Sequence, residues 1–300
     1  MKSIYTKVSI GQLCMLFGKT RHAFYDKSWH EEERLEGACV VLEMVAEIRR
    51  EIPGIGSAKL YHMINKPIKT QGIKLGRDAL HHLLCDYGLT VKRKRRYAVT
   101  TDSRHWLKKY PNLIKELIVT ESEHLWVSDI TYIVIGDDFN YLSLITDAYS
   151  KQIMGYCLHP TLGAEGCLNA LRMALANRTK VGAKLIHHSD RGIQYCCSDY
   201  VKLLKGANME ISMTENGDPY ENAIAERVNG ILKYEFELNQ MFNLREDATN
   251  AVGRSIKAYN TLRPHMSCNN LTPVEAHGMS GLLERKWKPK TYQKRLQPTI

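Results

Sequence analysis

The sequence predicts an α/β protein in which an all-helical region precedes a mixed, five-stranded sheet with flanking helices. Three observations predict this class. Apolar residues recur every three or four positions over residues 9–90, which is the period of amphipathic helices. From Leu125 the pattern changes to runs rich in Tyr, Ile and Val, which is typical of strands. Beyond residue 160 helical and strand-like segments alternate, and the chain is long enough for about two domains.

Residues 9–25 predict two short helices that meet at Gly18, with the spacing of a helix-turn-helix motif. The first helix has an apolar face made of Ile10, Leu13, Leu16 and Phe17. Thr20 can cap the second helix, which carries Arg21, a candidate contact to DNA. A plain helical hairpin has the same pattern, so that alternative stays open.

Further helices are predicted before residue 90. One covers residues 35–52 and ends at Pro53, after which Ser57 can cap the next helix. Another runs over residues 76–88, with Gly88 as its C-terminal stop and with Leu80, Leu83 and Leu84 buried. We therefore expect a helix-turn-helix region at residues 1–50 and a second helical DNA-binding region at residues 51–97.

Charge is distributed unevenly along the chain. Residues 1–120 contain 22 Lys and Arg against 12 Asp and Glu, a net charge of +10, whereas residues 121–300 contain 20 of each. This asymmetry predicts a polyanionic partner, most simply nucleic acid. Candidate phosphate contacts are the five consecutive cations Lys92, Arg93, Lys94, Arg95 and Arg96. A solvated linker is the alternative for this run, and residues 98–120 are predicted to be a linker.

The cysteines and the apolar runs of the sequence indicate the cellular compartment. Eight cysteines are scattered without a C-x-x-C pair, which predicts a reduced, cytosolic protein. No run reaches about 18 apolar residues and no signal peptide is recognisable, so we expect no membrane contact. Six cations lie between Arg285 and Arg295, and residues 284–300 are predicted to form a basic tail.

The second half of the chain predicts a ribonuclease H-like domain over residues 121–283. Residues 125–160 read as three antiparallel strands, the first two joined by a turn at residues 136–138. Alternating elements follow, namely a helix at 164–178, a strand at 184–190, a helix at 198–206, a strand at 210–214 and a long helix from about 220. A helix at 243–260 and a capping box at Thr272–Glu275 complete the domain. Three meander strands followed by alternating helices and strands is the element order of that fold.

Three acidic residues occupy positions that predict one site. Asp129 lies within an apolar strand, Asp190 ends a strand, and Glu226 lies on the long helix. An acid inside an apolar strand is costly to bury unless it is paired or holds a cation, and Mg²⁺ prefers carboxylate oxygens. Two Mg²⁺ ions about 4 Å apart would suit in-line attack at phosphorus, with Mn²⁺ as a possible substitute.

Other acids and a pair of histidines offer alternatives to this set of three residues. Asp137 and Asp138 belong to a turn and should face solvent, while Asp147 should make local hydrogen bonds. By itself Glu226 could be an exposed residue on a solvated helix face with no role in the site. It shares a polar stripe of the helix, however, with Asn222, Asn229 and Lys233. A zinc site of His187 and His188 with Cys196 or Cys197 lacks a second ligand pair of suitable spacing.

These motifs together resemble the open-reading-frame-B transposases of the insertion sequence 3 family, which carry a retroviral-integrase-like core. Thirty-five residues separate Asp190 from Glu226, as in the D,D(35)E signature of that core. Arg227 and the pair Cys196-Cys197 depart from common family residues without touching the three acids. The resemblance covers nearly the whole chain, through the segments 9–25, 76–89, 110–113, 126–131, 188–195, 220–235, 259–265 and 271–273.

The resemblance implies a Mg²⁺-dependent DDE transposase that nicks the 3′ ends of its element and joins them to target DNA. Asp129, Asp190 and Glu226 would be the catalytic metal ligands, and Lys233 would contact terminal DNA. His188 and Arg191 would order the site or meet phosphate, and Asn222, on the polar stripe with Glu226, would also order the site.

The resemblance also implies the partners of the chain. These are double-stranded DNA of the terminal inverted repeats and of the target, further copies of the chain on that DNA, and a helix-turn-helix protein or fusion from an upstream frame. The location would be the bacterial cytoplasm, at the nucleoid when bound. Two alternatives remain, a non-enzymatic DNA-binding regulator of transposition and a ribonuclease H-like nuclease acting on RNA hybrids.

Overall fold

A computed structural model describes residues 7–91, 106–215 and 222–287, without the side chains of residues 27–34. The chain divides into two compact units. The first contains residues 1–50 and 56–90, and the second contains residues 51–55 and 91–300. The predicted basic run Lys92–Arg96 and most of the predicted basic tail lie outside the described residues.

The described residues of the first unit form four helices. They are α1 (Ile10–Leu16), α2 (Arg21–Glu51), α3 (Ser57–Thr70) and α4 (Arg77–Asp86). Its apolar core includes Val41 and Val45 of α2, Leu60 and Ile64 of α3, and Leu80 and Leu84 of α4. The predicted stop at Gly88 is confirmed, because this residue has a φ of 67° immediately beyond α4.

The sequence-based prediction was wrong at two places in this unit. Two separate helices, one beginning near residue 20 and one at residues 35–52, are a single continuous α2. The stretch between them contains no Gly or Pro before Gly37, and its Glu and Arg residues favour a helix. The cap of α3 is Gly56 rather than Ser57, which is the first helical residue.

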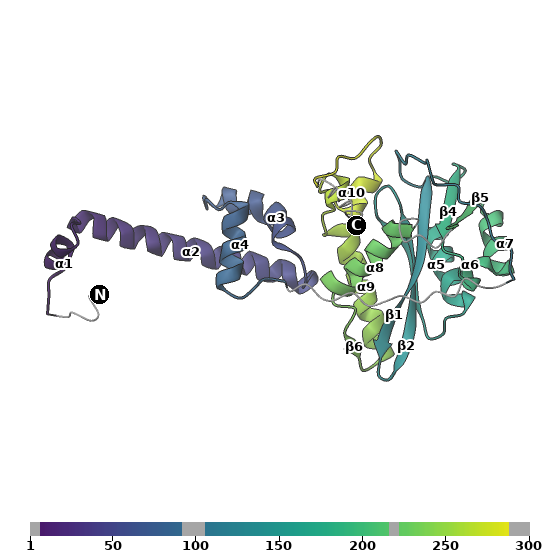
Figure 1. Ribbon diagram of the computed structural model, residues 1–300, viewed down its shortest axis with the longest axis horizontal. Coiled ribbons are helices and arrows are strands. Elements are labelled where there is room, and N and C mark those ends of the chain that lie inside the picture. Colours follow the sequence, from purple (N-terminus) through teal and green to yellow (C-terminus); the bar gives the residue numbers. More distant parts are fainter. Residues whose placement is uncertain (1–6, 92–105, 216–221, 288–300) are drawn as a thin grey trace, which may run out of the picture. The chain divides into compact units, whose positions relative to one another are not determined.

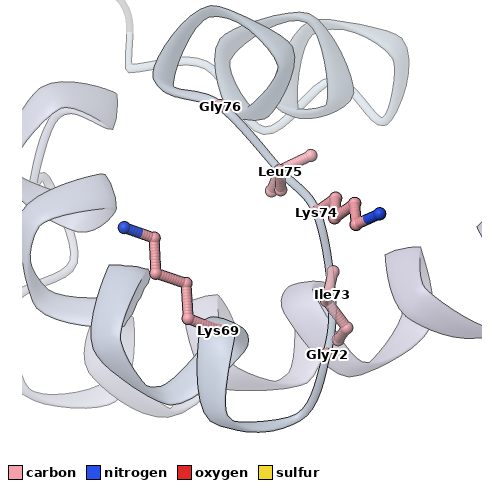
Figure 2. Close-up of a pocket in the computed structure, with 6 residues that line it drawn as sticks. All are labelled: Lys69, Gly72, Ile73, Lys74, Leu75 and Gly76. Carbon is pink, nitrogen blue, oxygen red and sulfur yellow. The ribbon is translucent and has the colours of Figure 1, made fainter.

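A hollow lies at the turn between α3 and α4. Its lining includes Lys69 at the end of α3 and Lys74 in the turn, and Figure 2 shows their ammonium groups pointing in different directions beside it. Gly72 reverses the chain there with a φ of 75°, a conformation that disfavours larger residues. Both lysines are exposed, so the turn presents two cations to solvent.

The second unit is built on the predicted mixed sheet (Figure 1). The strands are β1 (Leu125–Ile135), β2 (Asp138–Asp147), β3 (Ile153–His159), β4 (Leu185–Ser189) and β5 (Met209–Met213). Their order is β3-β2-β1-β4-β5, in which β1, β2 and β3 pair antiparallel and β4 and β5 continue parallel to β1. A sixth strand that was not predicted, β6 (Met241–Phe242), pairs with the far end of β1.

Helices cover both faces of the sheet (Figure 1). One face packs against α5 (Ala164–Ala176), α6 (Ile193–Cys196) and α7 (Ser198–Gly206), around a core that includes Trp126, Leu171 and Tyr200. Against the other face lies α8 (Ala223–Glu235), which buries Ala225 against Leu125 and Val127. These layers confirm the ribonuclease H-like class that the element order predicted.

Two further helices complete the second unit. They are α9 (Arg245–Thr261), which contacts α8 and β3, and α10 (Pro273–His277), which packs on α9. The predicted capping box is present, since Thr272 and Glu275 bond to each other's backbone. No helix in the described part of the chain is long and apolar enough to cross a membrane.

A buried ion pair joins α8 to the chain beyond α9. Arg263 is 2% exposed, and its Nε and Nη2 each donate to one carboxylate oxygen of Glu235 at 2.8 Å. The bidentate geometry is the strongest that a guanidinium makes with a carboxylate. Arg263 therefore has a structural partner within the protein, at the helix end that the Arg263-Pro264 step was predicted to mark.

Candidate active site

The sheet register brings Asp129 and Asp190 to the same level. Strands β1 and β4 run parallel, and their last paired residues are Val127 and His188. Asp129 and Asp190 each follow two residues later. Because β4 ends at Ser189, β1 has no partner strand on that edge from this point until β6 pairs with Val134 and Ile135, and the two carboxylates meet where the pairing with β4 stops.

Glu226 reaches the same region from the first turn of α8. Its charge and that of Asp190 both act on Asp129, so the three acids predicted to share a site are close enough to interact. Glu226 is exposed, and the partial desolvation of its carboxylate raises its pKa. The structure thus brings together side chains from a strand, a loop and a helix.

Asp129 has a strongly perturbed carboxylate. Burial first, and then the negative charges of Asp190 and Glu226, raise its pKa to about 7. Two hydrogen bonds oppose the shift, from the Ile130 amide to Oδ1 at 2.9 Å and from Asn229 Nδ2 to Oδ2 at 2.7 Å. A carboxylate in which burial and repulsion together outweigh hydrogen bonding is one that a cation would stabilise.

Gly192, two residues after Asp190, holds the Asp190 carboxylate in place. The Gly192 amide donates to Asp190 Oδ1 at 3.0 Å, and a Cβ at Gly192 would lie 3.0 Å from that same oxygen. Any larger residue would therefore crowd the carboxylate. The Asp-Arg-Gly order seen in the sequence has a steric basis in this turn.

The donor chemistry of the site fits a hard divalent cation, since all three side chains are carboxylates. Within the described ranges, however, no group of three or more His, Cys, Asp or Glu side chains is arranged to hold a metal ion. The three acids are neighbours whose charges interact, and their mutual repulsion favours a spread arrangement.

Two asparagines of α8 tie the helix to β1. Asn222, the N-cap residue, is 6% exposed, and its Nδ2 donates to the Ser128 carbonyl at 3.0 Å. Asn229 is equally buried and holds Asp129 directly. Asn229 was not predicted as a site residue, although its place on the polar stripe with Glu226 was a usable signal.

The histidines of β4 lie inside the protein. His188 is fully buried, and its Nδ1 lies 2.8 Å from Ser212 Oγ of β5. His187 Nε2 lies 2.7 Å from Ser128 Oγ and 2.9 Å from the Tyr200 hydroxyl, and burial lowers the pKa of His187 to about 3. These hydrogen bonds account for His187 without a zinc ion. The role of His188 in ordering the site stays a prediction.

Arg191 lies near an acid other than the three of the site. The pKa of Glu215 is lowered by its hydrogen bonds from Lys115 and Asn112 and, more weakly, by the charge of Arg191. Arg191 is half-buried and has contacts of its own within the protein. Its role in ordering the site or meeting phosphate stays a prediction.

Lys233 lies over an aromatic ring beside the site. Its Nζ is 3.8 Å from the centroid of the Tyr132 ring, a cation–π contact. Desolvation lowers the pKa of Lys233, and the charge of Asp129 opposes this shift. The side chain is therefore half-buried at the carboxylates, whereas Arg21 is exposed at the start of α2.

The remaining acids behave as predicted. Asp137 and Asp138 are exposed at the turn between β1 and β2. Asp147 is fully buried and accepts hydrogen bonds from the backbone amides of Glu123, Tyr149 and Ser150. These contacts cap the chain reversal after β2 and leave Asp147 no part in the site.

Models of known protein families match the region of the chain that contains this site. Residues 119–219 and 207–273 each match a model described as an integrase core domain. Both models lie in the second unit, and together they span all three carboxylates.

Curated relatives are similar over a larger share of the chain than the two family models. The chain is 34% identical over 268 residues to "Insertion element IS600 uncharacterized 31 kDa protein" of Shigella sonnei, covering 87% of this chain and 96% of that protein. It is 31% identical over 210 residues to "Transposase InsF for insertion sequence IS3A" of Escherichia coli (strain K12), covering 69% and 73%. A putative transposase for IS986/IS6110 of Mycobacterium tuberculosis is 28% identical over 226 residues, covering 73% and 80%.

Two solved structures are similar as well. The HTLV-2 integrase catalytic core domain in complex with magnesium is 19% identical, with a TM-score of 0.42, and covers 52% of this chain and 97% of that one. A simian T-cell lymphotropic virus intasome in complex with PP2A regulatory subunit B56 gamma is 20% identical, with a TM-score of 0.47, covering 80% and 81%.

Proposed function

The chain belongs to the insertion sequence 3 family of transposases and carries an integrase core domain, and on this premise we propose that Asp129, Asp190 and Glu226 catalyse both DNA cleavage and strand transfer. The observation that carries the proposal is the convergence of the three acids. Two stand at one level of the sheet, and the third acts on Asp129 from α8.

Both reactions are in-line displacements at phosphorus. In the first, water attacks the phosphodiester at the 3′ end of the element and the bond from phosphorus to the 3′ oxygen breaks. The 3′ oxygen takes up a proton from the water and becomes a hydroxyl, and the flanking strand keeps a 5′ phosphate that carries the water oxygen. In the second, that hydroxyl attacks a target phosphodiester and a target 3′ hydroxyl leaves. One arrangement of carboxylates therefore serves two nucleophiles.

The three carboxylates would hold two Mg²⁺ ions, for which Mn²⁺ is an alternative, and the bound ions would activate the nucleophile and neutralise charge on the leaving oxygen. Asn229 fixes the orientation of the Asp129 carboxylate through its 2.7 Å bond. Asn222 anchors the start of α8, from which Glu226 projects. Lys233 would meet a DNA phosphate beside the site, and His188 and Arg191 would support the loop of Asp190.

The direct test is an assay of the full chain with a labelled duplex that ends in the terminal inverted repeat of its own element. In the presence of Mg²⁺ we expect a nick at the 3′ end followed by joined products. Cleavage that continued equally in EDTA, or products formed without a free 3′ hydroxyl, would contradict the proposal.

The helical unit, together with the basic run Lys92–Arg96 that follows it in the sequence, would supply the contacts that hold the DNA. The basic run Lys92–Arg96 and Arg21 were predicted for this role, and the exposed turn lysines Lys69 and Lys74 add two cations to it (Figure 2). Because an element has two ends, we further propose that at least two copies of the chain assemble on the DNA, with or without a helix-turn-helix partner from an upstream frame. The reaction would take place in the bacterial cytoplasm, at the nucleoid.

A double variant, Lys69→Ala with Lys74→Ala, should weaken duplex binding and flatten its salt dependence. Each lost phosphate contact removes about one unit from the slope of log affinity against log salt. Fluorescence anisotropy between 50 and 200 mM salt would measure both, with Lys202→Ala as a matched control for an exposed lysine of the second unit. An unchanged slope would remove the turn from the DNA-binding surface.

A further inference from the structure

We propose that the side chains of Tyr132, Phe139 and Tyr141, called here the aromatic platform, hold an unstacked nucleobase of the DNA strand that lies in the active site. Lys233 would pair with the phosphate next to that base. This inference rests on the proposed function and extends it, because it assigns a binding site for a nucleotide outside the three carboxylates.

The sheet register places the three rings on one face. Tyr132 is paired with Tyr141 and Val134 with Phe139, so these side chains point to the same side. Further along, that side is covered by α5, as the contact between Ser143 Oγ and Cys167 Sγ shows. Helix α5 begins only at Ala164, and the aromatic platform lies at the end of the sheet that the helix leaves uncovered.

The rings are exposed and ordered against each other. Tyr132 is 46% exposed and Phe139 is 52% exposed, and their centroids lie 5.3 Å apart in an edge-to-face arrangement. Beside them lies a hollow whose lining is part aromatic and part polar, made of Asp138, Phe139, Asn140, Tyr141, Pro160, Thr161 and Leu162. Large apolar rings in a row with a hollow beside them suit a flat ligand with an apolar face.

The aromatic platform is continuous with the active site on two sides. Tyr132 follows Asp129 by three residues of β1, about 10 Å along the strand, so their side chains leave the strand on opposite faces. Lys233 of α8 links the two, because it lies over the Tyr132 ring while the charge of Asp129 acts on it. On the other side, the Leu162 carbonyl accepts a hydrogen bond from Gln194, four residues after Asp190, at 2.8 Å. A strand held at the carboxylates would therefore have its neighbouring nucleotide within reach of the rings.

Charge decides both the ligand and its orientation. Lys233 offers a cation at one edge, which favours a ligand that is anionic there, whereas Asp137 and Asp138 lie exposed at the other end. A nucleotide meets both conditions if its phosphate faces Lys233 and its base covers Phe139. Base stacking on an aromatic ring tolerates any sequence, because every base has a π-face.

The test uses the full chain and the variant Tyr132→Leu with Phe139→Leu, which keeps apolar volume and removes the rings. The matched control is Tyr132→Phe with Phe139→Tyr, which keeps them. Joining is measured with fully paired terminal-repeat ends and with ends whose last base pairs are mismatched. We expect the leucine variant to join paired ends at least about fivefold more slowly, and mismatched ends at nearly the rate of the wild type, because their bases are already unstacked.

Binding of a labelled single-stranded 12-nucleotide DNA by anisotropy gives a readout independent of chemistry. The leucine variant should bind it about fivefold to tenfold more weakly than the ring-retaining control. Equal single-strand affinity, or an equal joining defect on paired and mismatched ends, would overturn the proposal. If the wild type neither cleaves nor joins but the single-strand affinities differ as expected, the proposed function fails and the aromatic platform stands.

Discussion

Asp129→Asn, Asp190→Asn and Glu226→Gln should each abolish end cleavage and strand transfer, with losses on the order of a thousandfold or more. Each change removes one anionic oxygen from a set of three carboxylates that act as a unit. Duplex binding should remain within about twofold of the wild type, because the cations of the helical unit are untouched. Nicking and joining assays, run beside anisotropy on the same duplex, would separate the two properties.

Protein stability provides the control for this prediction, and its sign follows from the pKa of Asp129. In the unfolded chain an aspartic acid loses its proton near pH 4, whereas in the folded protein Asp129 keeps it to about pH 7. The folded state therefore binds more protons between these values, and the wild type loses stability as the pH rises through this window.

The side-chain amide introduced by Asp129→Asn does not titrate, so this variant should gain stability relative to the wild type between about pH 4 and pH 8 when unfolding is measured in EDTA. A variant that is inactive because it is unfolded would give no information about catalysis. If Glu226→Gln joined ends at nearly the wild-type rate, the set of three acids would be wrong. Glu215 is then the next candidate among the described residues, although it already pairs with Lys115 and accepts a bond from the Asn112 amide.

Arg263→Ala should lower the free energy of unfolding by about 3–5 kcal/mol, because it leaves the carboxylate of Glu235 largely buried without its bidentate partner. The double variant Arg263→Met with Glu235→Leu should recover most of this loss, since apolar pairs of similar volume replace buried ion pairs at little cost. Urea unfolding monitored by tryptophan fluorescence would measure both.

Arg254→Ala is the matched control, since this arginine is exposed on α9 and its loss should change stability by less than about 0.5 kcal/mol. A loss for Arg263→Ala as small as that of the control would show that the ion pair contributes little. A loss of DNA joining at full stability would instead assign Arg263 to the DNA.

Much of the second unit could be predicted because its signals are local. Strand and helix periods identified β1 to β5 and α5, and the capping box before Pro273 identified α10. Asp129 stood out because an acid within an apolar strand needs a compensating partner. Even the local role of Asp147 followed from its place at a strand end.

Boundaries were less predictable where no residue forces one. The predicted break in α2 was wrong. The pattern around Thr20 indicates where a helix begins, but it does not indicate where that helix ends, and α2 continues to Glu51. Strand β6 has only two residues and is defined by its partner β1 rather than by its own sequence. Such elements depend on neighbours that lie far away along the chain.

Residue type, period and spacing were enough to predict the fold class and the three acids, and the motifs were enough to show the resemblance to the family, because each of these lies in short stretches of the chain. Packing was needed to show that Asn229 holds Asp129, 100 positions away, and that Arg263 pairs with Glu235. Packing also leaves Tyr132 and Phe139 uncovered beside Lys233. Hydrogen bonds and ring contacts act over a few ångströms, so they exist only where the fold brings distant segments together.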